Sequence, residues 1–235
     1  MEIQKFIANI GDTTDITDVF SVDHHLYADD TQLQKHMRVC EIQANCQNLA
    51  QCVVAVGEWC SSRRLQLNTD KTEQIWFGSR TNIKRIQQED TSLPIGSTII
   101  IPVHSVRNLG VYMESEMSMR VHVGKVASAC FYHLRRLRQL HFTQTRPMMQ
   151  HLASAFILLW FNYCNIVLAG LPAIMLAPLQ QVINAAIQLV AGLVWRDHVT
   201  PAMRELHWLP VVYRIKYKLC ILMHASVNGR FPEYI

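Results

Sequence analysis

A long stretch of this chain carries no charge. From Pro147 to Trp195 there is no Asp, Glu, Lys or Arg. A membrane-spanning helix needs about 20 mainly apolar residues, whereas the most apolar piece here, Leu152 to Phe161, is roughly half that length. It is followed by residues that break up a span: Asn162, Asn165, Pro172, Pro178, Gln180, Gln181, Asn184 and Gln188. The pattern therefore favours helices packed on several sides over a membrane span.

The length and composition allow a folded protein with one or two domains. The chain has 235 residues, half of them are apolar, and the formal net charge is +4. This apolar content is sufficient to bury a core. A mildly basic chain is compatible with nucleic-acid contact, but many other binders and enzymes share such a charge.

The cysteines favour an intracellular protein, in the nucleus or the cytoplasm. Their number is odd, no Cys-x-x-Cys occurs, and no paired His spacing completes a zinc site. We expect reduced and mostly buried thiols. No basic segment followed by an apolar stretch and a cleavage site opens the chain, so we expect no secretory signal. The cysteines are Cys40, Cys46, Cys52, Cys60, Cys130, Cys164 and Cys220.

The hydrophobic patterns of the first half alternate between strand and helix. A β-hairpin is expected over 24–34 and a helix over 41–64, where apolar residues recur at three- and four-residue steps. Two extended pieces, 65–67 and 73–77, flank a turn. A second β pair is expected between 98–101 and 106–113, and the polar segment 79–97 is expected to be a loop.

The second half is predicted to be mainly helical. Helices are expected near 118–140, 145–161, 174–194 and 210–228, separated by Gly- and Pro-containing segments. The chain is therefore predicted to be α+β, with an α/β part over 1–115 and a helical part over 116–235.

The segment Tyr27-Ala28-Asp29-Asp30 is the strongest candidate for chemistry. It lies between two short β patterns, so we expect the Asp pair at the tip of a tight hairpin. Polymerases place carboxylates at such tips, because nucleotidyl transfer uses two divalent ions about 3.5–4 Å apart. Since successive strand side chains point to opposite faces, we expect Asp29 to be the metal ligand and Asp30 its support. The alternative is a solvated turn.

Several segments, in order, resemble the reverse transcriptases of LINE-type (non-LTR) retrotransposons of the Jockey and chicken-repeat kind. His25–Leu33 is similar to motif C, Leu67–Glu73 with Trp76–Ser79 to motif D, and Arg107–Val111 to motif E. Segments similar to the helical region after the palm are Tyr163–Asn165, Leu168–Pro172, Gln181–Ala186, Arg196–Pro201 and Leu206–Pro210.

The resemblance implies a partial polymerase palm over 1–115 and a thumb-like helical region over 116–235. It implies RNA-templated addition of deoxynucleotides to a DNA primer, with an RNA template, deoxynucleoside triphosphates and Mg²⁺ held by Asp29 and Asp30. Lys71 would act near the incoming triphosphate, and Leu109, Gly110 and Val111 would form the primer grip. The alternatives are a solvated lysine and a glycine at a strand bulge.

Two motifs of that family are missing from the sequence. The motif A aspartate and the Gln-Gly of motif B precede motif C, and neither context occurs before Tyr27. We therefore expect a C-terminal fragment that is inactive alone. The rival interpretation is a non-catalytic remnant that binds nucleic acid through charge.

A cationic run gives a candidate surface for that binding. On a helix, Arg135 and Arg138 share a face and Arg136 lies to its side. Such a stripe could follow a phosphate backbone without reading its sequence. The alternative is a solvated helix face.

Overall fold

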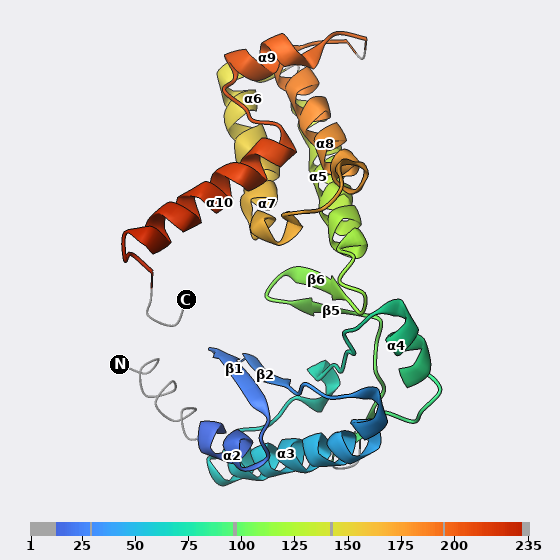
Figure 1. Cartoon of the computed structure of the whole chain (residues 1–235). Coiled ribbons are helices and arrows are strands. Elements are labelled where there is room, and N and C mark those ends of the chain that lie inside the picture. Colours follow the sequence, from blue (N-terminus) through green and yellow to red (C-terminus); the bar gives the residue numbers. More distant parts are fainter. Residues whose placement is uncertain (1–12, 29, 96–97, 142, 195, 232–235) are drawn as a thin grey trace. The chain divides into compact units, whose positions relative to one another are not determined.

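The computed structural model describes residues 13–28, 30–95, 98–141, 143–194 and 196–231 (Figure 1). Within these ranges the fold is α+β with a mainly helical second half, as predicted, and it contains three two-stranded hairpins. The chain forms two compact units. The first holds the residues up to Val106 together with Glu114–Met117, and the second holds Arg107–Met113 and the chain from Ser118 onward. Their assignment as palm and thumb-like parts stays a prediction.

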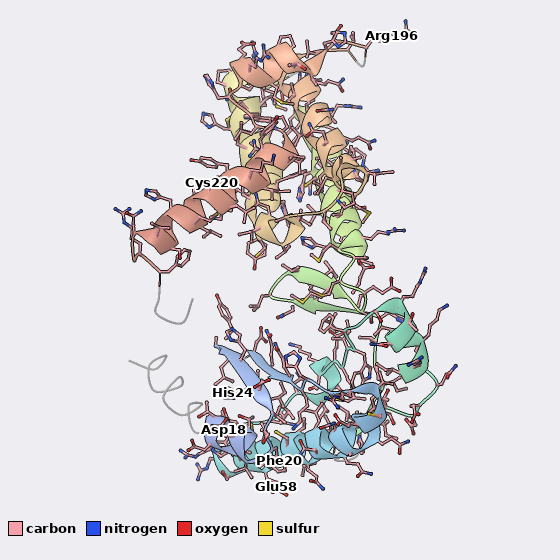
Figure 2. All side chains as sticks on the ribbon, in the orientation of Figure 1. Asp18, Phe20, His24, Glu58, Arg196 and Cys220 are labelled. Atoms are coloured by element: carbon pink, nitrogen blue, oxygen red, sulfur yellow. The ribbon has the colours of Figure 1, made fainter. Side chains whose placement is uncertain are left out.

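The first unit begins with a short helix and the predicted hairpin. Helix α2 (Thr13–Val19) is followed by strands β1 (Asp23–Tyr27) and β2 (Asp30–Gln34), which pair antiparallel. Helix α2 is joined to the hairpin at His24, marked in Figure 2, whose Nδ1 lies 2.8 Å from the Thr17 hydroxyl. The predicted hairpin over 24–34 is confirmed for the described residues.

Helix α3 (Ile42–Ser62), preceded by a 3₁₀ turn η1 (Val39–Glu41), confirms the helix predicted over 41–64. Its apolar side is buried in the core of the first unit because these residues recur at three- and four-residue steps. The core also takes side chains from α4 (Arg80–Ile86), β3 (Leu93–Ile95) and β4 (Thr98–Ile100). Its buried members are Ile42, Cys46, Val53, Ile83, Ile86, Leu93, Ile95 and Ile100.

The predicted loop over 79–97 is wrong, because this segment contains α4 and β3. Ser79 caps α4, where its hydroxyl accepts a hydrogen bond from the backbone N–H of Asn82. Ile83 and Ile86, one turn apart, are buried. The polar residues around them hide a short amphipathic helix that is stabilised by its contacts with the rest of the core.

The predicted pairing of 98–101 with 106–113 is also wrong. Strand β4 pairs with β3, and β5 (Ser105–Asn108) pairs with β6 (Val111–Glu114). Each hairpin closes through only two residues, which costs less chain entropy than a longer connection. In the described structure the pieces predicted to be extended at 65–67 and 73–77 form no strand, and Ile75 makes an isolated bridge to Val103.

Apart from the turn region of the β5–β6 hairpin, the second unit is built from helices (Figure 1). They are α5 (Arg120–Leu140), α6 (Arg146–Ala153), a π-helical segment η3 (Ser154–Leu158), α7 (Leu159–Asn162), a 3₁₀ turn η4 (Asn165–Leu168), α8 (Ala173–Ala191), α9 (Val199–Glu205) and α10 (Val211–Val227). The four predicted helices are confirmed to within a few residues. Helix α9 was not predicted, because seven residues are too few to show a clear period.

Helix α8 lies in the core of the second unit, packed against α5, α6, α9 and α10. Leu179, Val182, Ile183, Ala186 and Ile187 are at most 1% exposed. Among the helices described here, α8 alone has the length and composition to cross a membrane, but a buried core helix passes the same test. Burial against four helices accounts for the absence of charge in this part of the chain.

This packing predicts that two isoleucines of α8 differ greatly in how much their substitution by alanine lowers the stability of the chain. Ile183→Ala should lower the free energy of unfolding by about 2–5 kcal/mol, because it leaves a cavity in the core. The matched change Ile174→Ala, at a side chain 80% exposed, should stay within about 0.5 kcal/mol. Urea denaturation measures both, and equal small effects would contradict the core position of α8.

Candidate functional site

The turn between β1 and β2 is as tight as the sequence predicts. Tyr27 pairs with Asp30, so only two residues join the strands. Ala28 has a φ of 54°, the left-handed backbone typical of two-residue hairpin turns. Asp29, the predicted metal ligand, lies outside the described residues.

The register of the hairpin places Asp30 on its exposed face. Directly paired residues share a face, so Asp30 lies with Tyr27, and His25 with Gln32 lies on the same side. On the opposite face, Leu33 packs against the core of the first unit. The Asp30 carboxylate is therefore directed away from the core and accessible to a cation or a ligand.

The described residues supply one carboxylate at this turn. Asp23, the other acid of the same face, pairs with Gln34 at the far end of the hairpin. No group of three His, Cys, Asp or Glu side chains in the described ranges could hold a metal ion. Mg²⁺ usually binds one or two carboxylates together with substrate phosphates and water. Asp30 would fit as one such ligand, and the predicted Mg²⁺ site with Asp29 stays a prediction.

Lys71 lies at the end of a 3₁₀ turn, η2 (Thr69–Lys71). The side chain of Asn68 accepts a hydrogen bond from the backbone N–H of Lys71 at 3.3 Å, which holds the turn. The Lys71 side chain is exposed. Its role near a triphosphate stays a prediction, and in the described structure no hydrogen bond or ion pair joins it to Asp30.

The predicted primer-grip residues form the turn of the β5–β6 hairpin. Leu109 and Gly110 have φ values of 44° and 84°, and Val111 is buried in the core of the second unit. The Tyr163 hydroxyl donates a hydrogen bond to the carbonyl of Leu109. A Cβ atom on Gly110 would lie 3.1 Å from Cε1 of Tyr163. Gly110 therefore sits in a two-residue turn against Tyr163.

The predicted cationic stripe lies on the outer face of α5. Arg135, Arg136 and Arg138 are exposed, whereas the neighbouring Leu134 and Leu137 are buried. In the described structure none of the three arginines pairs with a carboxylate. Their charges are therefore available to an external anion.

Aromatic rings accompany this stripe, which the sequence reasoning missed. The guanidinium of Arg136 lies 5.8 Å from the centre of the Tyr132 ring. The ring of His133 stacks on Phe156, which comes from the π-helical segment, with centroids 5.6 Å apart. Exposed rings next to cations are typical of surfaces that bind single-stranded nucleic acid. Tyr132 was visible in the sequence, but only the fold brings Phe156 into contact with His133.

Comparison of the chain with known protein families, with curated proteins and with solved structures finds no match.

The stripe on α5 predicts salt-dependent binding to nucleic acid. Arg135→Ala combined with Arg138→Ala should weaken binding of a single-stranded oligonucleotide and reduce the slope of log K against log salt by roughly 1.5. This pair leaves Arg136 stacked on Tyr132. The matched pair Lys84→Ala and Arg85→Ala, exposed cations on α4, should leave the slope unchanged. Fluorescence anisotropy across a salt series measures the affinity of each variant for the oligonucleotide. An equal loss of affinity in both double variants would indicate that the stripe is a solvated helix face without a binding role.

The β5–β6 turn predicts opposite effects for two glycines. Gly110→Ala should destabilise the chain by about 1–2 kcal/mol from its left-handed φ alone, and the contact with Tyr163 adds to this cost. Gly124→Ala, within α5 and with open space around its Cβ, should instead stabilise by about 0.5–1 kcal/mol. Denaturant unfolding measures both changes, and a neutral Gly110→Ala would show that the turn can relax.

Proposed function

We propose that this chain is the C-terminal part of a reverse transcriptase of a LINE-type retrotransposon, from motif C through the thumb-like region. The observation that carries the proposal is the two-residue turn that presents Asp30 on the exposed face of the β1–β2 hairpin. A turn with Lys71, a second tight turn at Leu109–Gly110 and a helical region then follow in the order that the motifs require.

In this function a deoxynucleotide is added to the 3′-hydroxyl of a DNA primer on an RNA template. Asp29 and Asp30 would hold Mg²⁺, which when bound offsets the charge of the triphosphate. Lys71 would neutralise negative charge that develops on the leaving pyrophosphate. The backbone at Leu109, Gly110 and Val111 would lie along the primer strand.

The proposed chemistry needs groups from another polypeptide segment. Two metal ions require several anionic oxygens around them, and no residue before Tyr27 has the context of the motif A aspartate. We therefore propose that the chain is inactive alone and acts together with a segment that carries motifs A and B, inside the cell.

A second candidate function is supported by the face of α5. Its exposed arginines and neighbouring rings suit binding of nucleic acid without catalysis. A non-catalytic remnant would bind nucleic acid with a steep salt dependence and would support no extension under any combination of segments.

Primer extension distinguishes the two functions. We expect no extension by the purified chain with Mg²⁺ or Mn²⁺. Joined to the upstream part of a related enzyme that carries motifs A and B, it should extend a primer on an RNA template. Asp29→Asn should abolish that activity because it removes a metal ligand, and Lys71→Ala should slow it by about 10²-fold.

The matched control is Asp23→Asn, an acid on the same face as Asp30 at the opposite end of the hairpin, which should retain activity. Extension by the joined enzyme that survives Asp29→Asn would exclude the proposed role of the Asp pair. Extension by the unmodified chain would exclude the need for another segment.

A further inference from the structure

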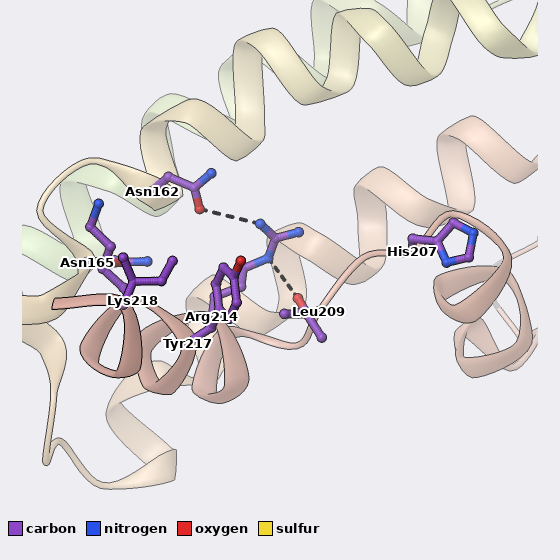
Figure 3. Close-up of a pocket in the computed structure, with 8 residues that line it drawn as sticks. Asn162, Asn165, His207, Leu209, Arg214, Tyr217 and Lys218 are labelled. Carbon is purple, nitrogen blue, oxygen red and sulfur yellow. Dashed lines mark hydrogen bonds between the residues drawn. The ribbon is translucent and has the colours of Figure 1, made fainter. Parts of the chain in front are cut away.

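A cavity of about 290 Å³ opens in the second unit, between the region of α7 and η4 and the helix α10 (Figure 3). Helix α10 forms one wall with Arg214, Tyr217 and Lys218. Asn162 and Asn165 contribute from the segment that follows the π helix, and His207 from the loop before α10. Asn165 and His207 lie in segments that resemble the helical region after the palm, but none of the lining residues belongs to the segments similar to motifs C, D and E.

The charge in this cavity is positive and uncompensated. Arg214 and Lys218 lie one helical turn apart, so they share a face of α10. No Asp or Glu lines the cavity, and across the described ranges no carboxylate pairs with either cation. The cavity therefore has two cations and no anion to balance them.

Arg214 is held in place by neutral groups alone. Its Nε donates to the Leu209 carbonyl at 2.8 Å and its Nη1 to Oδ1 of Asn162 at 3.4 Å (Figure 3). Burial lowers the pKa of Arg214, but a guanidinium stays protonated at neutral pH. A half-buried cation without a counterion is costly, and its orientation is already fixed by the two hydrogen bonds.

Asn165 adds an unsatisfied polar group at the cavity wall. This residue is 5% exposed, and its side-chain oxygen accepts no hydrogen bond from the described residues. A buried acceptor without a donor costs about 1–3 kcal/mol. A hydroxyl of an occupant would supply the donor once the amide turns toward the cavity.

We propose that this cavity binds the phosphate group of a nucleotide, either free or within a nucleic-acid backbone. The two hydrogen bonds to Leu209 and Asn162 leave further N–H groups on Nη1 and Nη2 of Arg214, which suit two phosphate oxygens, and Lys218 acts as a point charge on a third. A ribose hydroxyl of a free nucleotide can donate to the side-chain oxygen of Asn165, whereas the phosphodiester of a DNA backbone carries no hydroxyl and leaves that oxygen unsatisfied. Tyr217, whose ring is 61% exposed, offers a surface on which a base can stack.

Two lysines of α10 make a matched test. Lys218 lines the cavity, whereas Lys216, two residues away, lies 5.8 Å from the ring of Tyr213. Calorimetric titration of the full chain uses inorganic phosphate, adenosine monophosphate and a short single-stranded DNA, each against chloride at equal ionic strength. Lys218→Ala should weaken binding by about tenfold, equivalent to about 1.4 kcal/mol, and Lys216→Ala by less than about twofold.

The three ligands distinguish the two sources of the phosphate. If the free nucleotide binds and competes with DNA, and Lys218→Ala weakens both, the site takes phosphate from either source. If only DNA binds, and Lys218→Ala weakens its binding, the site takes a phosphate of a nucleic-acid backbone. If only the nucleotide binds, the site takes the phosphate of a free nucleotide.

Two results would overturn the proposal. The first is the absence of saturable binding by all three ligands to a chain whose thermal unfolding shows it to be folded. The second is an equal loss in Lys216→Ala and Lys218→Ala, which would reduce the effect to the overall charge of α10. Arg214→Lys is a further variant. It keeps the positive charge of the cavity but loses the planar guanidinium, so it should weaken phosphate binding.

Discussion

The burial of α8 is the constraint on which the second unit depends. Four helices contact it, and its central residues are almost wholly removed from water. A charged side chain on these faces would be buried without a partner, which is prohibitive unless it is neutralised. On the helices around α8, cations such as Arg135, Arg138 and Arg204 therefore lie at exposed positions. On α5, Leu134 and Leu137 point inward and the arginines outward.

Helix α10 shows how the same constraint creates a binding surface. Val211 and Ile215 are buried, and this fixes the rotation of the helix. Arg214 and Lys218 are then directed along the side of the helix toward the segment around Asn162 and Asn165. The apolar contacts of α10 thus bring two cations to one cavity, and the electrostatic character of the cavity follows from hydrophobic packing.

In the first unit, the alternation of side chains along the strands decides which residues of the β1–β2 hairpin face the core and which are exposed. The hairpin β1–β2 packs the partly buried Leu33 against the core and so exposes the side that carries Asp30. A shift of the register by one residue would reverse both. The two-residue turn prevents that shift, because Tyr27 and Asp30 must pair directly. The position of the candidate carboxylate and the stability of the hairpin therefore depend on one turn.

The sequence by itself determined the elements whose signals are local. The helix at Ile42–Ser62 follows from apolar residues at three- and four-residue steps, and the β1–β2 hairpin from two short β patterns around an Asp pair. The absence of charge before Trp195 was enough to predict a helical core. For the candidate site, the sequence supplied Asp30, Lys71, Gly110 and the arginines of α5, because each belongs to a short motif or run.

The tertiary structure alone decided which distant segments meet. Helix α4 depends on burial of two isoleucines that a polar segment conceals, and the pairing of β4 with β3 depends on the cost of closing a loop. Tyr163 reaches the turn at Leu109, Phe156 reaches His133, and Asn162 reaches Arg214. No local period encodes these contacts, since they arise when apolar faces of separate helices are buried together and carry the polar side chains beside them into contact.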